Sequence, residues 1–231
     1  MKICSHFFRF IMSFGLNNSH GANNNSHSTY YGASEIHFSH EEEGLSVTIH
    51  TERLCMRSIK ATKAEYENYA ALFGDKNVMG KFATGETRTK IDIEERIENI
   101  WAARWHNGDP YAGFSVFEKN TKDFLGHVVL GHSDSPGESE LAYLFHQKYW
   151  GQGYGSEAAM AMVREYAPAT VKEGYTIDGK PLQKIVATAR PDNPASGLIL
   201  QKVGMHLGPA EEKYGALRHH YSIELDEIQE K

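Results

Sequence analysis

A stretch of alternating glycines is the feature of this chain that most directly suggests chemistry. Residues 149–158 read YWGQGYGSEA, with glycine at positions 151, 153 and 155. Glycine has no Cβ, so its backbone turns sharply and comes close to a ligand. Where a helix follows such a turn, its first N–H groups and its dipole favour an anion. The spacing therefore indicates a site for a phosphate or pyrophosphate.

Three interpretations of the glycine stretch compete. A dinucleotide-binding fingerprint needs G-x-G-x-x-G after the first strand of the fold, followed by an acidic residue, whereas this stretch reads G-x-G-x-G and comes late in the chain. A Walker A loop needs Gly-Lys-Ser/Thr, and here the order is Gly-Ser-Glu. The third interpretation is a tight strand-to-helix turn that binds nothing, and the glycines alone leave it open.

Several strand patterns must position this stretch. Apolar residues at alternate positions predict strands over 46–58 (one strand or a pair), 111–118, 124–131, 139–146, 184–190 and 219–225. The runs 111–118 and 124–131 are close enough to form an antiparallel hairpin. Within 139–146, Leu141, Tyr143 and Phe145 share one face, and Glu140 shares the other with Ala142 and Leu144.

Helices are predicted between these strands. Thr62 followed by Glu65 is a capping box that opens a helix through Phe73. A second helix is predicted from Asp92 to His106. The helix after the glycines has a predicted buried stripe made of Ala158, Ala159, Met162, Val163 and Tyr166.

The last predicted helix follows Asn193. Asn193 is suited to the cap and Pro194 to the first helical position. Gly204 is suited to closing the helix in the left-handed conformation. The residues expected to face inward are Leu198, Ile199 and Val203. Together these elements predict an α/β domain with a mixed sheet.

Composition excludes several classes of protein. The net charge of −6 argues against a general nucleic-acid binder, and a mean hydropathy of −0.52 argues against a membrane span. Two cysteines fit a reducing, cytoplasmic setting and no cysteine-rich metal site. Residues 1–43 include the tract NNSHGANNNSHS and are expected to be a disordered extension. The domain is expected to span 44–231.

Further motifs surround the glycine stretch. They are Thr51-Glu52-Arg53-Leu54 with Arg57, Asp75 with Val78-Met79, Glu140-Leu141-Ala142-Tyr143, Tyr149 to Tyr154 with Glu157-Ala158, Asn193-Pro194-Ala195-Ser196, and Lys202-Val203-Gly204-Met205. With these motifs in this order, the chain resembles the GNAT N-acetyltransferases, and among them the RimJ/RimL-like branch. The family's loop pattern begins with Gln or Arg where this chain has Trp150, a residue common in that branch.

The resemblance implies a GNAT fold, in which two adjacent parallel strands of a mixed sheet splay apart between flanking helices. It implies that acetyl-CoA binds in the splay, with no metal. The pantetheine arm would lie along the strand that carries Leu141 and Tyr143, near Asn193. The pyrophosphate would rest on the N–H groups of Gln152, Gly153, Tyr154, Gly155 and Ser156.

The implied reaction transfers an acetyl group directly to a primary amine. It needs a deprotonated amine, a polarised thioester carbonyl and a proton for the thiolate. Glu140 is the expected general base, directly or through water, with Glu138 and His146 in reserve. The tyrosine that many members use as proton donor is replaced by Leu200, so Ser196 is the expected substitute.

Tyr214 and Tyr221 also remain possible proton donors. The acceptor is expected to be a small-molecule amine or a protein N-terminus, with no nucleic-acid or membrane partner, and the enzyme a monomer or homodimer. The segment 168–183 is long for a connection and is expected to shape a wall of the pocket or a dimer contact. Two alternatives stay open: a non-catalytic acyl-CoA-binding sensor or partner module, and a nucleotide-binding enzyme of another class.

Overall fold

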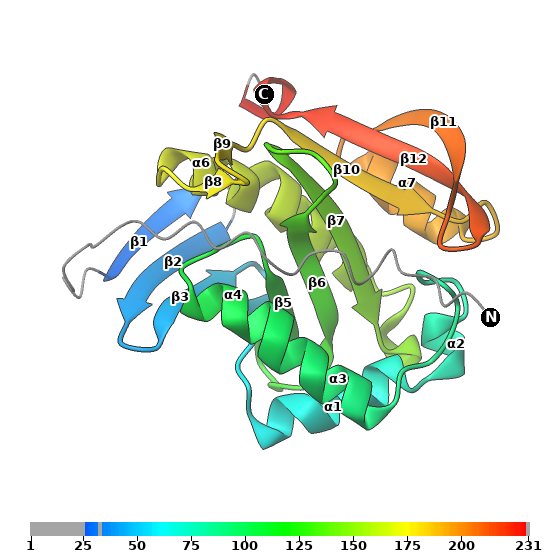
Figure 1. Ribbon diagram of the computed structural model, residues 1–231, viewed down its shortest axis with the longest axis horizontal. Helices are drawn as coiled ribbons and strands as arrows, with labels where there is room; N and C mark the ends of the chain where they lie inside the picture. The colour runs from blue at the N-terminus through cyan, green and yellow to red at the C-terminus, as the bar shows by residue number, and fades with distance from the viewer. Residues whose placement is uncertain (1–25, 32–33, 230–231) are drawn as a thin grey trace.

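One twisted sheet of ten strands organises the computed structural model, which describes residues 26–31 and 34–229. The strand order is β1-β2-β3-β4-β5-β6-β7-β10-β12-β11, and Figure 1 shows β1 and β11 at opposite ends of the sheet. The strands are β1 (Ser26–Tyr31), β2 (Ser34–Glu41), β3 (Gly44–His50), β4 (Leu54–Ser58), β5 (Gly113–Glu118), β6 (Phe124–His132), β7 (Glu138–Phe145), β10 (Lys184–Ala189), β11 (His206–Lys213) and β12 (Ala216–Glu224). Strands β8 (Thr176–Ile177) and β9 (Lys180–Pro181) form a separate small hairpin.

Helices cover both faces of the sheet. The helical segments are α1 (Lys63–Phe73), α2 (Lys76–Met79), α3 (Lys90–Arg96), η2 (Ile97–Ala102), α4 (Ala103–His106), η3 (Gln147–Tyr149), α5 (Tyr154–Ala161), η4 (Met162–Tyr166), α6 (Ala167–Lys172), α7 (Pro194–Lys202) and α8 (Leu225–Gln229). The continuous helix α3-η2-α4 crosses in front of the sheet in Figure 1, beside α1. Within the described residues, every helix is too short or too polar to cross a bilayer.

The predicted elements are largely confirmed. The range 46–58 falls in the antiparallel pair β3–β4, 111–118 and 124–131 fall in the antiparallel pair β5–β6, and the stripe predicted for the helix after the glycines is fully buried. The expectation for Leu198 is wrong, because its side chain is 66% exposed while Leu200 is 1% exposed. On α7 the side chain of Leu200 therefore faces the core and that of Leu198 faces solvent.

The predicted disorder is wrong for part of the N-terminal extension. Residues 26–31 and 34–41 form strands β1 and β2, and β2 pairs with β3 across the boundary drawn at residue 44. Ile36 and Phe38 are fully buried, and Phe38 stacks on Tyr166 with ring centroids 6.1 Å apart. Their alternation with Glu35 and His37 is a strand pattern that the polar tract upstream obscured. Residues 1–25 lie outside the described residues.

The Glu65 side chain does not complete the predicted capping box but points into the core. The Thr62 hydroxyl accepts from the Glu65 N–H, as predicted. The Glu65 side chain, however, is fully buried, with Oε1 2.7 Å from Arg57 Nη2 and Oε2 accepting from the Ser115 hydroxyl at 2.8 Å. Burial raises the pKa of Glu65, and the Arg57 charge opposes that shift. Its carboxylate joins α1 to β4 and β5.

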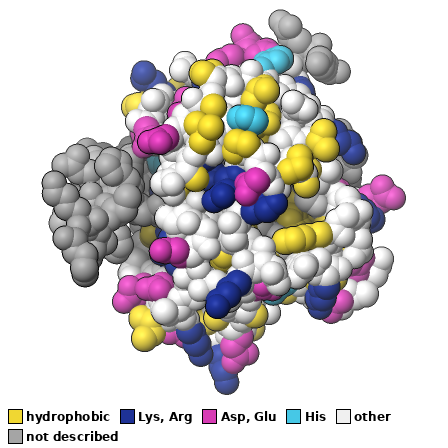
Figure 2. Space-filling view, turned by 90° about the vertical axis from the view of Figure 1, so that its right-hand side faces the viewer, with side chains coloured by type: hydrophobic (Ala, Val, Ile, Leu, Met, Phe, Trp, Pro, Cys, Tyr) yellow, Lys and Arg dark blue, Asp and Glu magenta, His cyan; other side chains and the backbone are white. Residues whose placement is uncertain are grey.

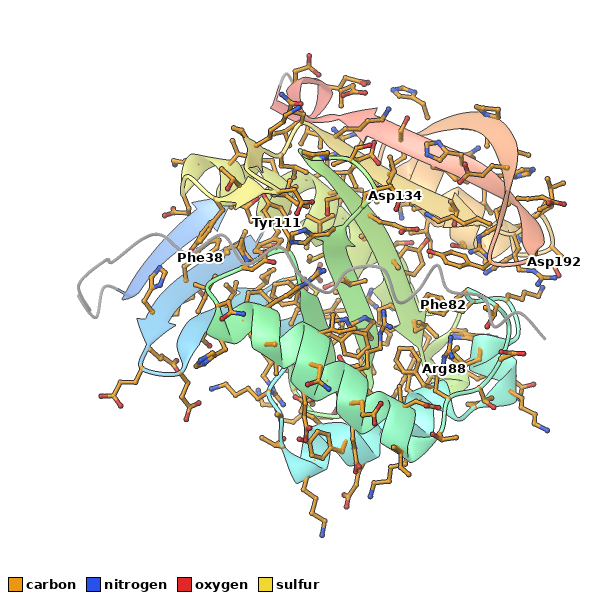
Figure 3. All side chains as sticks on the ribbon, in the orientation of Figure 1. Phe38, Phe82, Arg88, Tyr111, Asp134 and Asp192 are labelled. Atoms are coloured by element: carbon orange, nitrogen blue, oxygen red, sulfur yellow. The ribbon has the colours of Figure 1, made fainter. Side chains whose placement is uncertain are left out.

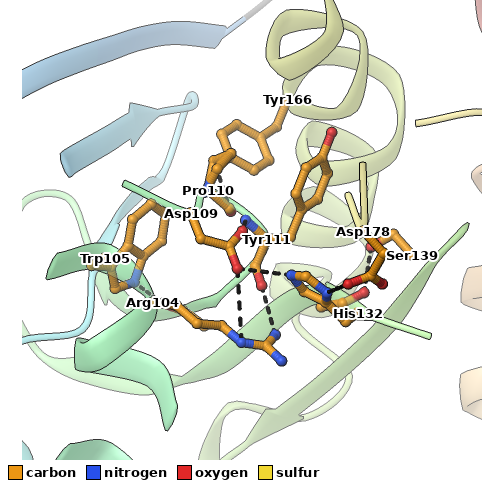
Figure 4. A network of polar contacts seen from close by, with 11 residues as sticks. Arg104, Trp105, Asp109, Pro110, Tyr111, His132, Ser139, Tyr166 and Asp178 are labelled. Atoms are coloured by element: carbon orange, nitrogen blue, oxygen red, sulfur yellow. Dashed lines mark hydrogen bonds and ion pairs between the residues drawn. The ribbon is translucent and has the colours of Figure 1, made fainter. Parts of the chain in front are cut away.

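A second polar network ties loops together beyond β6. His132 lies 2.8 Å from Asp109 through Nε2 and 3.0 Å from Asp178 through Nδ1, as Figure 4 shows. Arg104 donates to the carbonyl of Tyr111 at 2.8 Å. The histidine therefore connects the loop after α4 to the β8–β9 hairpin. Among the described residues, no group of three or more His, Cys, Asp or Glu side chains is arranged to hold a metal ion.

Candidate active site

Two neighbouring parallel strands separate in the middle of the sheet. Strand β7 pairs with β10 through only three positions, which end at Glu140 and Val186. Beyond them, β7 stays paired with β6 as far as Phe145, and β10 stays paired with β12 as far as Ala189. In Figure 1 the two arrows point away from one another past this position. One edge of β7 beyond Glu140 therefore lies outside the β7–β10 ladder, as the predicted splay requires.

The glycine loop follows the end of β7 and leads into α5. Gly151 and Gly153 have φ of 72° and 84°, values that residues with a Cβ rarely adopt. No side chain caps α5 at Gly153, so the first N–H groups of the helix have no capping side-chain acceptor. Trp150 donates its indole N–H to the carbonyl of Phe145 at 2.7 Å and fixes the loop to the end of the strand. Gln152 donates to the Lys148 carbonyl at 2.8 Å.

A brace from the start of β4 holds this loop in place. The Glu157 carboxylate accepts from the Thr51 hydroxyl at 2.6 Å and from Arg53 N and Nε at 2.8 and 2.7 Å. Arg53 Nη1 also donates to the Gln152 carbonyl at 2.9 Å, and its guanidinium lies 4.6 Å from the ring centroid of Tyr154. Sequence reasoning recorded Thr51 and Arg53 only as motif residues and missed this contact.

Gly155 serves packing at the base of the loop. A Cβ on Gly155 would lie 3.3 Å from Ile199 Cδ1 and 3.7 Å from the ring of Phe145. The glycine therefore lets α5 approach α7, which forms the opposite wall of the splay. Ser156, in the same turn of α5, is partly buried.

Hydroxyl groups meet across the splay. Tyr143 Oη lies 3.0 Å from Ser196 Oγ and donates to the Ser196 carbonyl at 3.1 Å. Burial raises the pKa of Tyr143, so the phenol stays protonated near neutral pH. Asn193 accepts from the Ser196 N–H at 3.4 Å and caps α7, as predicted. A Cβ on Gly197 would lie 2.7 Å from Tyr221 Oη, so a second phenol reaches the same turn of α7.

Glu140 sits where the splay begins, on the opposite face of β7 from Tyr143. Its Oε1 lies 3.2 Å from Lys213 Nζ, which comes from the end of β11. Burial lowers the pKa of Lys213, but the charge and hydrogen bond of Glu140, together with Tyr214 and Asp134, outweigh burial, so the pKa is raised. Burial raises the pKa of Tyr214, and the Glu140 charge adds to that rise. Glu140 is thus a partly buried carboxylate with one cationic partner.

The other candidates differ in position. Leu141 is 2% exposed, so only its backbone is available to a ligand. Glu138 accepts from the Ser133 hydroxyl at 2.6 Å in the turn before β7. Burial lowers the pKa of His146, whose ring lies 5.8 Å from that of Phe124. Leu200 is buried and has no proton to donate.

Comparison with known proteins agrees with this geometry. The acetyltransferase (GNAT) domain family matches residues 53–206. The chain belongs to the GNAT acetyltransferase family. By its family it is an acyltransferase, and its fold is the GNAT fold.

Individual relatives support the same assignment. The uncharacterized N-acetyltransferase YnaD of Bacillus subtilis (strain 168) is 26% identical over 160 residues, which cover 68% of this chain and 81% of YnaD. A GNAT-family acetyltransferase structure from Bacillus anthracis has a TM-score of 0.62 at 23% identity and covers 78% of this chain and 99% of that one. The structure of RimL, a ribosomal L7/L12 alpha-N-protein acetyltransferase in complex with coenzyme A, has a TM-score of 0.60 at 15% identity, covering 76% of this chain and 96% of that one.

Proposed function

We propose that this protein is an N-acetyltransferase that moves the acetyl group of acetyl-CoA directly to a primary amine. The observation that carries the proposal is the alignment of three features along one strand: the β7 edge beyond Glu140, the glycine loop that follows β7, and the Glu140 carboxylate where the splay begins. The acceptor is a small-molecule amine or a protein N-terminus.

The residues fit the two halves of this cosubstrate. The N–H groups of residues 152–156, at the start of α5, suit a pyrophosphate. The β7 backbone at Leu141 and Tyr143 suits the amides of a pantetheine arm, because a strand outside its ladder offers donors and acceptors in a row. Asn193 and Ser196 line the facing wall at the start of α7.

Glu140 is the proposed general base. An ammonium has no lone pair, so the amine must lose a proton before it attacks the thioester carbon. Glu140 accepts that proton directly or through one water, as the new C–N bond forms and the C–S bond breaks. Lys213 Nζ lies 3.2 Å from Glu140 Oε1 and fixes the position of the carboxylate.

The leaving thiolate needs little general-acid catalysis. Thiols have pKa values of about 8–9, so thiolate departs more readily than an alkoxide. Tyr143 and Ser196 form a hydroxyl pair at 3.0 Å that can deliver a proton from the α7 side of the splay. Burial raises the pKa of Tyr143, so its phenol stays protonated and holds a hydrogen bond with the Ser196 hydroxyl.

The test replaces Glu140 by Gln in the full chain. Free thiol released from acetyl-CoA is followed over a panel of amines, and CoA affinity is measured by calorimetry. Glu140→Gln is expected to lower kcat by about 10²- to 10⁴-fold, typical of a lost acid–base group, with CoA affinity within twofold. Wild-type protein that binds CoA and acetylates no amine would instead identify a non-catalytic acyl-CoA-binding module.

A further inference from the structure

The partner of the proposed general base is itself a primary amine. Lys213 Nζ donates a hydrogen bond to Glu140 Oε1 at 3.2 Å. A general base must lie about 2.6–3.2 Å from the atom whose proton it takes. The acetyl transfer proposed above needs an amine at this distance from Glu140, and in the structure the ε-amine of Lys213 occupies that position.

The hairpin formed by β11 and β12 holds this amine in place. Lys213 is the last residue of β11 and pairs with Ala216 across the turn. Its ammonium nitrogen lies 5.3 Å from the ring centroid of Tyr214, the first residue of that turn. The side chains of Lys213 and Glu140 are 26% and 23% exposed, respectively. The two groups are therefore fixed against each other and are still open to a reactant.

The charges around Lys213 keep it protonated in the resting protein. Glu140, Tyr214 and Asp134 raise the pKa of Lys213 and outweigh the lowering effect of burial. Asp134 lies on the loop that leads from β6 into β7, as Figure 3 shows. Arg218 adds a positive charge on the same hairpin, 5.5 Å from the ring centroid of Tyr214. Because an ammonium has no lone pair, Lys213 reacts only after it has lost a proton, and Glu140 is the base in contact with it.

We propose that Lys213 is a modification site of this protein, acetylated on its ε-amine within the same chain. The inference rests on the proposed acetyl transfer and adds an acceptor that the chain itself carries. The Lys213 nitrogen forms a C–N bond with the acetyl carbon of acetyl-CoA as the C–S bond breaks. Of the two protons that the ammonium loses, one leaves to solvent through Glu140 and the other ends on the thiolate. Lys213 becomes a neutral acetamide, and coenzyme A leaves as a free thiol.

Exposure and position favour different lysines, which makes the proposal testable. Figure 2 shows Lys and Arg side chains at several places on the face turned to the viewer. The side chain of Lys63, on α1, is 89% exposed, so uncatalysed reaction with acetyl-CoA favours Lys63 over Lys213. Lys184 resembles Lys213 more closely, since it is 34% exposed and pairs with Glu224 at 3.5 Å, but it lies at the end of β10 that stays paired with β7. Faster acetylation of Lys213 than of either lysine therefore reports catalysis at Glu140.

The test follows isotope-labelled acetyl groups in the full chain. The protein is incubated with labelled acetyl-CoA and no other amine, and peptide mass spectrometry measures the labelled fraction of each lysine over time. Lys213 is expected to be labelled about 10²-fold faster than Lys63 and Lys184. Its rate constant should not depend on protein concentration, because the base and the amine lie in one chain. An unlabelled acetyl group already present on Lys213 in the purified wild-type chain, and absent from purified Glu140→Gln, is the same result.

Two matched variants separate catalysis from exposure. Glu140→Gln should slow the labelling of Lys213 by about 10²-fold and leave that of Lys63 unchanged, and its CoA affinity reports whether it folds. Glu224→Gln is the control, because it removes the partner of Lys184 from an ion pair of the same kind. It should leave the labelling of Lys213 unchanged. Lys213 labelled no faster than Lys63, equal labelling of Lys213 in Glu140→Gln, or a rate constant proportional to protein concentration would overturn the inference.

Failure of the inference and failure of the proposed function give different results. If the amine panel is acetylated and Lys213 is not, the inference is overturned and the proposed acetyl transfer stands. If Lys213 is labelled and the panel is not, the inference is supported and the transfer is restricted to the chain's own amine. If neither is acetylated, the proposed acetyl transfer fails and the inference fails with it.

Discussion

His127 gives the sharpest quantitative prediction. It is 1% exposed in the sheet beneath α1, and its Nδ1 lies 3.0 Å from Tyr69 Oη. Burial, followed by the Arg96 charge, lowers the pKa of His127 to about 3. An unfolded histidine titrates near 6.5. Between those two values the unfolded chain binds a proton that the folded chain does not, so stability falls as pH falls through this window.

The size of the effect follows from the two pKa values. Between pH 7 and pH 4, the His127 contribution to the free energy of unfolding should fall by about 3 kcal/mol. Below the folded value both states are protonated and the loss levels off. His127→Phe keeps a ring of similar shape and cannot titrate. Tyr69 keeps a hydroxyl partner in Ser115 at 3.2 Å.

Urea unfolding of the wild-type and His127→Phe chains at pH 7, 6, 5 and 4 isolates this contribution, since titrating groups common to both cancel in the difference. The gap in stability should shift by about 3 kcal/mol in favour of the variant on acidification. A shift under about 1 kcal/mol would refute the reasoning. In the Arg96→Gln background the shift should shrink, because removing that cation lets the folded His127 bind a proton more readily.

Two further predictions concern the site and its supports. Glu157→Gln should lower the free energy of unfolding by about 1–3 kcal/mol, because Glu157 accepts three hydrogen bonds from the residues at the start of β4. The same substitution should weaken CoA binding severalfold, because it loosens the glycine loop. An unchanged CoA affinity in calorimetry would show that these hydrogen bonds do not hold the loop. Leu200→Ala should lower the free energy of unfolding, measured in urea, by about 2–5 kcal/mol, because Leu200 is buried. Leu198→Ala should lower it by under about 0.5 kcal/mol, because Leu198 is exposed. Equal losses of stability in the two variants would contradict the orientation of α7.

Local sequence patterns were sufficient to predict most strands and helices and the glycine loop. The alternation in 139–146 predicted which side chains of β7 share a face, because successive side chains point to opposite sides of a strand. Gly151 and Gly153 predicted a sharp turn for the same local reason, and both have positive φ in the structure. Asn193 and Pro194 predicted the start of α7, since capping depends on neighbours within one turn.

Patterns failed where a distant contact decided the outcome. The alternation of Ile36 and Phe38 became a strand because β3 offered an edge and Tyr166 a buried ring to stack on. Glu65 satisfied the capping pattern, yet its carboxylate points inward because Arg57 and Ser115 supply a charge and a hydroxyl there.

By itself, then, the sequence determined that strand, glycine turn and helix follow one another within 139–166, and that Glu140 lies on the strand before the turn. Only the tertiary structure decided the charge around Glu140. Lys213 lies 73 positions away along the chain, and it reaches Glu140 because the β11–β12 hairpin joins the sheet beside β10, the neighbour of β7. Residue type and spacing report neighbours within a few positions, whereas electrostatic environment depends on how strands are ordered in space.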